Sequence, residues 1–302
     1  MKTAVNSEYN RHRRRMNVQD IIFSRACFAG AILMCLVLFA IVGLVGKAGL
    51  QVFKDVSPLE YFFSLNWTPE DNHFGAAVFI LGTFALTGLT LLIAAPISIA
   101  LAVFTAEIAP AWMKGFLRSA LNLLVGIPSI IYGYIGITVL IPLIRHFTGA
   151  VLGDGLLAAA IVLALMVLPT ITSIADDSLT FLPKEYREAA YAVGSTRWQM
   201  IIHILLPGAK NGITTGIILG MARAIGETMA VVMVIGNVPQ IPVNLVTPTT
   251  VLTSNIVMQI LGVEYGGTWS NALYMMAFML LIISLGLILV VRRVTRKGVK
   301  LG

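Results

Sequence analysis

Two ionisable side chains, Arg223 and Glu227, lie inside an apolar stretch, 211–236, that holds no other charge. Residues four positions apart share one face of a helix. If the helix begins near residue 211, Arg223 lies about 18 Å along it, near the midplane of a bilayer. A charge at that depth costs from about 2.5 to more than 10 kcal/mol. Both side chains are therefore expected to face the interior of a helix bundle.

Two interpretations of this pair remain open. Arg223 and Glu227 could form a buried ion pair that only fixes packing, or they could line an ion path. An arginine is well suited to bidentate contact with an oxyanion, whereas a neighbouring carboxylate competes with an anionic substrate. We favour the ion path.

Other chemistry finds little support in the sequence. No G-x-x-x-x-G-K-[ST] phosphate-binding loop occurs, so any ATP and Mg²⁺ are expected on a partner chain. The histidines at 12, 73, 146 and 203 are scattered and predict no metal site. The cysteines, at 27 and 35, predict no disulfide framework. We expect no enzyme site and no cofactor in this chain.

The composition predicts an all-α protein that crosses a membrane several times. Of 302 residues, 58% are hydrophobic and only 12% are charged, against about a quarter in soluble domains. Six apolar spans are expected, near 22–46, 76–105, 116–144, 155–177, 211–236 and 271–291.

The basic residues predict the orientation. Seventeen lie in regions expected on the cytoplasmic side and three, Lys47, Lys54 and Arg145, in regions expected outside. Cytoplasmic loops carry the excess of Lys and Arg, so both termini are expected in the cytoplasm. Basic residues beside spans indicate contact with membrane lipid rather than nucleic acid. The expected organisation is a basic segment 1–20, a first helix and external loop 21–75, a core 76–291 with a cytoplasmic loop 178–210, and a basic tail 292–302.

Irregular segments are expected in three places. Gly126-Ile-Pro-Ser129 is predicted to break the third span, either as a packing kink or lining a cavity. The external segment 237–270 contains an apolar part, Thr249 to Leu261, typical of a short interfacial or re-entrant helix. Trp67 is expected to mark the membrane interface.

A polar segment from Phe181 to Pro207 reads as two short helices. Pro183 suits a first helical turn, Gly194 a left-handed helix end, and Ser195 an N-cap, while Pro207 is expected to stop the second helix. One face of the first helix carries a mostly small, apolar set: Tyr186, Ala189, Ala190 and Val193. The hairpin either covers its own core or docks another protein.

The following span carries Gly212, Gly216 and Gly220 at a spacing of four. Such a stripe of small residues lets a neighbouring helix approach closely. It lies about 100° around the helix from the Arg223 face. One face is therefore expected to pack and an adjacent face to carry charge.

The hairpin resembles the EAA loop of ABC-importer permeases. Glu188-Ala189-Ala190, then Gly194, then Ile204-x-Leu206-Pro207 match that loop in residue type and spacing. The resemblance implies a six-helix, MetI-like permease fold with the loop docked on a separate ATPase in the cytoplasm. It implies a set of ATPase-coupling residues: Tyr186, Arg187, Glu188, Ala189, Ala190, Gly194, Arg197 and Pro207. Glu188, Ala189, Ala190 and Gly194 are expected to fix the bend, with Tyr186, Arg187 and Arg197 nearest the partner.

Further motifs are similar to phosphate importers. Arg223 to Ala230, Leu168 to Asp177 and Gly126 to Gly133 look like signatures of their membrane subunits, and Trp67-Thr-Pro69 looks like the PstC type rather than the PstA type. The resemblance implies a bacterial inner-membrane permease of an ATP-driven phosphate importer, with Arg223, Glu227 and Thr228 on the substrate pathway.

The implied partners are a PstA-type sister permease, a PstB-type ATPase dimer and a PstS-type external phosphate-binding protein. Three alternatives stay open: a permease for sulfate or molybdate, an ion-coupled transporter that needs no ATPase, and a membrane signalling scaffold.

Overall fold

The computed structural model describes the backbone of residues 2–297 and the side chains of residues 20–290, 292 and 293. Position 1 and the end of the predicted basic tail, 298–302, lie outside the described residues. The described chain is almost entirely helical, which confirms the all-α prediction. Its six helical segments long and apolar enough to cross a membrane are Asp20–Lys54, Ala77–Ile108, Ser129–Thr148, Leu156–Thr180, Arg197–Gly226 and Thr268–Val290.

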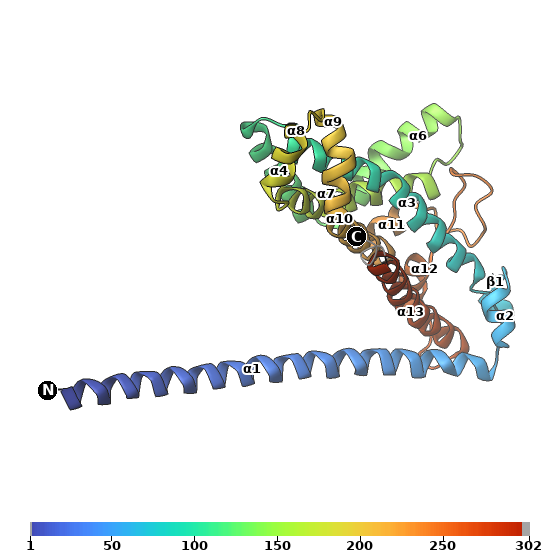
Figure 1. Cartoon of the computed structure of the whole chain (residues 1–302). Helices are drawn as coiled ribbons and strands as arrows, with labels where there is room; N and C mark the ends of the chain where they lie inside the picture. The colour runs from blue at the N-terminus through green and yellow to red at the C-terminus, as the bar shows by residue number, and fades with distance from the viewer. Residues whose placement is uncertain (1, 298–302) are drawn as a thin grey trace.

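The N-terminal helix α1, Lys2–Leu50, projects away from the rest of the molecule (Figure 1). Only its last turns pack, against α13 (Thr268–Lys297). Gly46 and Gly49 permit this approach, since a Cβ at Gly49 would lie 2.7 Å from the Cα of Met275. The basic segment 1–20 and the first span are thus one continuous helix over the described residues.

A small cap of short elements follows α1. It consists of η1 (Gln51–Lys54), α2 (Pro58–Phe63), β1 (Trp67–Thr68), η2 (Pro69–Asp71) and β2 (His73–Phe74). The two strands pair antiparallel, with Trp67 opposite Phe74.

Trp67 does not mark the interface as predicted. Its ring lies 5.6 Å from that of Phe74 and 5.1 Å from that of Phe79, and only 6% of it is exposed. Its Nε1 donates to Oε1 of Gln259 at 3.3 Å. A buried indole needs an acceptor, and tertiary packing supplies one here.

Three helices form the core of the bundle: α3 (Ala77–Val103), α7 (Leu156–Thr180) and α10 (Leu206–Gly226). Helix α7 is the most buried of the six spans. The stripe of Gly212, Gly216 and Gly220 faces α7, where a Cβ at Gly220 would lie 2.7 Å from Cγ1 of Ile171. Because these glycines have no side chain beyond a hydrogen atom, α10 can approach α7 closely.

The chain breaks near Pro128 as predicted, but the break precedes the third span instead of interrupting it, because the membrane-length helix is Ser129–Thr148 and not 116–144. Helix α4 (Ala111–Gly126) ends before Pro128, and the chain resumes as α5 (Ser129–Ile135), a π-helical turn η4 (Gly136–Leu140) and α6 (Ile141–Thr148). Pro128 directly precedes α5, where a backbone N–H would have no partner within the helix, so the N–H that proline lacks is not missed there. The chain between α3 and α4 is a second π-helical turn, η3 (Phe104–Ile108).

The fifth span differs from the predicted continuous helix 211–236. Helix α10 ends at Gly226, Glu227 is extended, and a short helix α11 (Met229–Val234) follows. Tertiary contact stabilises the break, because the Glu227 carbonyl accepts from Oγ1 of Thr253 at 3.2 Å. Thr253 belongs to α12 (Leu252–Gln259), which with η6 (Ile260–Gly262) forms the short helix predicted in the external segment.

Candidate translocation and coupling sites

Arg223 lies near the end of α10 and is partly exposed. Its Nη1 donates to Oγ1 of Thr170 on α7 at 3.3 Å. Among the described side chains no carboxylate oxygen lies within ion-pair distance of it. The predicted alternative of an Arg223–Glu227 ion pair is therefore not realised in this structure.

The helix break explains why the pair does not form. Since α10 stops at Gly226, Glu227 no longer continues the helical face of Arg223. Its Oε1 instead accepts from the backbone N–H of Ala230 at 3.3 Å, at the start of α11. Thr228 donates from Oγ1 to the Gly226 carbonyl at 3.3 Å. Glu227 and Thr228 thus stabilise the break, and Arg223 keeps donors available for an anion.

A polar face of α7 leads away from Arg223. Thr170, Ser173 and Asp177, three and four positions apart, are the partly or fully exposed polar residues of this helix face. Ser173 and Asp177 line a cavity of about 220 Å³ together with Arg118 and Asn122 of α4. This face connects Arg223, beside Thr170, to the polar cavity near the C-terminal end of α7.

Two residues that line this cavity, Arg118 and Asp176, form an ion pair. Arg118 donates from Nε to Oδ2 of Asp176 at 2.7 Å and from Nη2 to Oγ1 of Thr180 at 3.3 Å. The hydrogen bond to the Asp176 carboxylate raises the pKa of Arg118. Sequence reasoning missed both residues, because the 58 positions between them leave no local pattern.

The hairpin that follows α7 consists of α8 (Lys184–Ala192) and α9 (Arg197–Met200). Gly194 has φ +79°, the predicted left-handed helix end. Thr196, not Ser195, caps α9: its Oγ1 accepts from the Gln199 N–H at 3.3 Å, and Oε1 of Gln199 accepts from the Thr196 N–H at 2.9 Å. This reciprocal capping box needs Gln three residues after the cap, a spacing that only Thr196 has.

Pro207 does not stop the second helix, contrary to the prediction. Helix α9 continues through a π-helical turn, η5 (Ile201–Leu205), into α10. Pro207 lies in the first turn of α10, and the wider π turn accommodates its missing N–H donor. The hairpin and the Arg223 helix are consequently one helical rod from Arg197 to Gly226.

Arg187 faces into the chain and not outward as expected. Its Nε and Nη2 donate to Oε1 of Glu107 at 3.0 and 2.6 Å, and Nη1 and Nη2 also donate to the carbonyls of Leu182 and Leu179. Arg197 donates to the backbone carbonyl of Glu107. Glu107, which the sequence analysis did not identify, therefore holds both helices of the hairpin to η3, the turn that follows α3.

The remaining hairpin residues are either buried or exposed. Ala190 is buried in a cluster that contains Met200 and Ile201 of the hairpin's second helix. Tyr186, Glu188, Ala189, Gly194, Arg197 and Pro207 are exposed. Three large apolar side chains beside them, Phe181, Val193 and Trp198, are 83%, 80% and 69% exposed. An apolar surface of this kind at a helical turn is typical of a protein interface.

Comparison with known proteins gives consistent matches. Residues 98–298 match the family model described as "Binding-protein-dependent transport system inner membrane component". The chain is 46% identical to "Probable ABC transporter permease protein YqgH" of Bacillus subtilis, over 87% of each chain. It is 34% identical to "Phosphate transport system permease protein PstC" of Xylella fastidiosa, over 89% of this chain and 91% of that one.

Solved structures share the fold. The bacterial ABC transporter that imports alginate aligns over 93% of this chain and 99% of its own, with a TM-score of 0.62 at 17% identity. The MetNI methionine ABC transporter, in an inward-facing form, aligns over 72% and 93% with a TM-score of 0.57 at 22% identity. The chain belongs to the binding-protein-dependent transport system inner membrane component family, as a multi-pass bacterial plasma-membrane permease with the MetI-like ABC-importer fold.

Proposed function

We propose that this chain is a permease subunit of an ATP-driven inorganic phosphate importer. The single observation that carries the proposal is Arg223, an arginine in a membrane-spanning helix without a carboxylate partner among the described residues. A neutral Thr170 orients it and leaves its charge uncompensated. Relatives named as phosphate transport permeases support phosphate as the oxyanion.

Arg223 would meet the anion at the break between α10 and α11. Its guanidinium offers several N–H donors in a planar fork, the geometry that suits the oxygens of a phosphate. A single arginine with one weak hydrogen bond gives a low-affinity contact, and passage requires release. From there the polar face of α7 would lead the ion to Arg118 and Asn122.

We further propose that a separate ATPase docks on the hairpin at the cytoplasmic side, with both chain termini on that side. The exposed set Tyr186, Glu188, Ala189, Gly194 and Arg197 would meet it. Because the rod from Arg197 reaches Arg223, about 39 Å away at 1.5 Å per residue, movement of the hairpin moves the arginine. The full assembly would contain a PstA-type sister permease, two PstB-type ATPases and a PstS-type binding protein.

The test is uptake of radiolabelled phosphate by the complex in proteoliposomes. We expect Arg223→Ala to lower uptake at least tenfold while the ATPase still co-purifies, because the substitution leaves the hairpin intact. Arg145→Ala, which removes an exposed arginine from the far end of the bundle, serves as the charge-matched control. Uptake at the wild-type rate by Arg223→Ala would refute the role of Arg223.

The same assay separates the alternatives. Excess sulfate or molybdate should leave phosphate uptake unchanged. Uptake should cease without ATP and survive collapse of ion gradients. Uptake that follows an ion gradient and ignores ATP would instead establish the ion-coupled transporter.

A further inference from the structure

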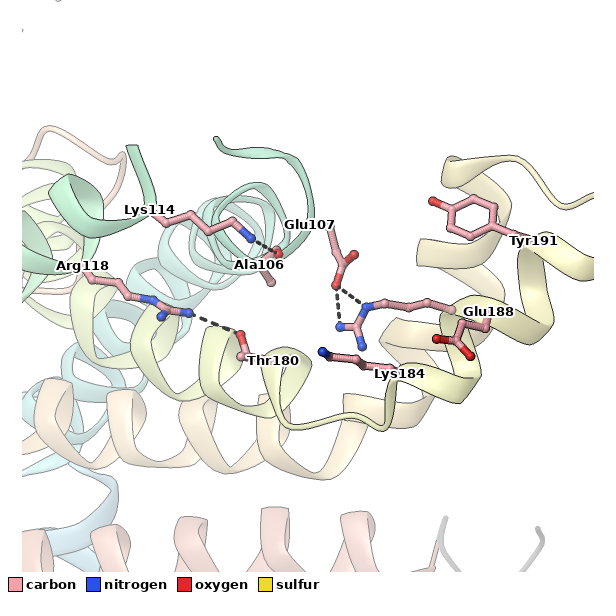
Figure 2. A pocket seen from close by; sticks show the side chains of 9 residues that line it. Ala106, Glu107, Lys114, Arg118, Thr180, Lys184, Glu188 and Tyr191 are labelled. Atoms are coloured by element: carbon pink, nitrogen blue, oxygen red, sulfur yellow. Dashed lines mark hydrogen bonds and ion pairs between the residues drawn. The ribbon is translucent and has the colours of Figure 1, made fainter. Parts of the chain in front are cut away.

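A second cavity, which shares Arg118 with the first, has a lining in which cations outnumber carboxylates. It has a volume of about 490 Å³ and lies between α4 and α8, with Ala106 and Glu107 of η3 also in its lining (Figure 2). Its charged lining is Glu107, Lys114, Arg118, Lys184, Arg187 and Glu188. Four cations thus face two carboxylates, and the volume falls in the range of small-molecule sites.

Internal partners neutralise only part of this charge. Glu107 is committed to Arg187, and Arg118 is committed to Asp176. Lys114 uses one N–H for the Ala106 carbonyl, at 2.6 Å, and keeps two of its three donors.

Lys184 makes no hydrogen bond or ion pair with any described residue. Glu188, one turn along α8, is the nearest counter-charge by spacing. Lys114 and Lys184 therefore present spare ammonium donors to the cavity from opposite walls.

The wall made by α4 has a second property. Trp112 and Phe116 are 70% and 67% exposed, one turn apart on the helix, while Lys114 and Arg118 face the cavity. A short amphipathic helix with aromatic residues on one face and basic residues on the other is typical of a membrane interface. A helix of that kind would place the mouth of the cavity at the depth where lipid phosphates lie.

We propose that this cavity binds a phosphate group, with Lys114 and Lys184 as its principal contacts. The bound group would hold α8 against α4 and so set the resting position of the coupling hairpin. The phosphate belongs either to an anionic lipid headgroup or to free inorganic phosphate. Placement in the cytoplasmic leaflet follows from the proposed function, whereas binding itself does not depend on it.

The experiment uses the purified complex in nanodiscs of phosphatidylcholine, with or without an equal share of phosphatidylglycerol. Native mass spectrometry measures retained phosphatidylglycerol, and hydrogen exchange of α8 measures the effect of millimolar inorganic phosphate. The variant is Lys114→Gln/Lys184→Gln. The matched control, Lys47→Gln/Lys54→Gln, removes two exposed lysines at the opposite end of the membrane span.

Each basic side chain contributes about fivefold to affinity for an anionic surface, so the double variant should bind about 25-fold more weakly. If the bound phosphate belongs to a lipid headgroup, the double variant should no longer retain phosphatidylglycerol. If it is free inorganic phosphate, millimolar phosphate should no longer slow the hydrogen exchange of α8 in the double variant. The control should behave like the wild type in both measurements.

The single variant Lys184→Gln guards against misfolding, because Lys184 makes no hydrogen bond or ion pair that the substitution would remove. Its affinity for the phosphate group should fall about fivefold. Wild-type lipid retention together with a wild-type response to phosphate in the double variant would overturn the proposal. Failure of phosphate uptake would overturn the proposed function but leave these binding measurements unaffected, so the two failures are distinguishable.

Discussion

Replacing Glu107 with glutamine tests whether one carboxylate fastens the coupling hairpin to the bundle. Oε1 of Glu107 accepts two hydrogen bonds from Arg187, at 3.0 and 2.6 Å. A hydrogen bond to a charged group is worth about 1 kcal/mol more than a neutral one. The side chains of Arg187 and Glu107 are 21% and 9% exposed, so solvent weakens the two bonds only in part.

The expected loss for Glu107→Gln is about 1.5 kcal/mol in the local opening free energy of α8, or roughly tenfold faster amide exchange. Arg187→Met should cost about 3 kcal/mol, since it leaves a buried carboxylate without a cation. The double variant should cost less than the sum of the two, because neither buried charge then remains unpaired.

The assay is hydrogen exchange of the α8 amides, followed by mass spectrometry, on the complex in nanodiscs. Glu185→Gln is the control: Glu185 is exposed in the same helix and makes no hydrogen bond or ion pair with described residues. Its loss should cost about 0.3 kcal/mol, less than twofold in rate. If Glu107→Gln exchanges no faster than Glu185→Gln, or if the two single effects simply add, the reasoning is wrong.

Two glycine substitutions extend the predictions. Gly194→Ala should destabilise the hairpin by about 1–2 kcal/mol and lower ATPase co-purification, because φ is +79°; Gly115→Ala, in an open helical position, should raise the thermal midpoint instead. Unchanged ATPase retention by Gly194→Ala would contradict the role of the turn. Gly82→Ala should lower the thermal midpoint by the equivalent of about 1–3 kcal/mol, since its Cβ would meet the backbone carbonyl of Thr250. Gly88→Ala, with open space on the same helix, is the control, and equal midpoints for the two variants would count against the packing argument.

Local features of this chain could be predicted from its sequence. The six spans follow from the length of the apolar segments. In lipid a backbone can form hydrogen bonds only within the protein, and a helix satisfies this requirement. Gly194 and the break at Pro128 follow from backbone chemistry that each residue carries by itself. The family resemblance of the hairpin also rests on residues close together in the chain.

Two of the failed predictions show how a local preference can be overridden. Pro207 reads as a helix stop, yet a π turn carries the helix through it. Trp67 reads as an interfacial residue, yet Phe74, Phe79 and Gln259 enclose it. For Pro207 the neighbouring π turn overrides the local preference, whereas for Trp67 tertiary packing does so.

For the charged residues, too, the sequence determines one property and the tertiary structure another. The sequence alone determined that Arg223 lies within a membrane-spanning segment, because the apolar stretch around it is long enough to cross a bilayer. Only the tertiary structure decided its partner. Contact of α12 with the Glu227 carbonyl ends α10 at Gly226, which turns Glu227 away and leaves Arg223 with the hydroxyl of Thr170. A charge within a membrane-spanning helix takes the partner that packing brings within reach, and that partner, Thr170, lies 53 positions away in the sequence.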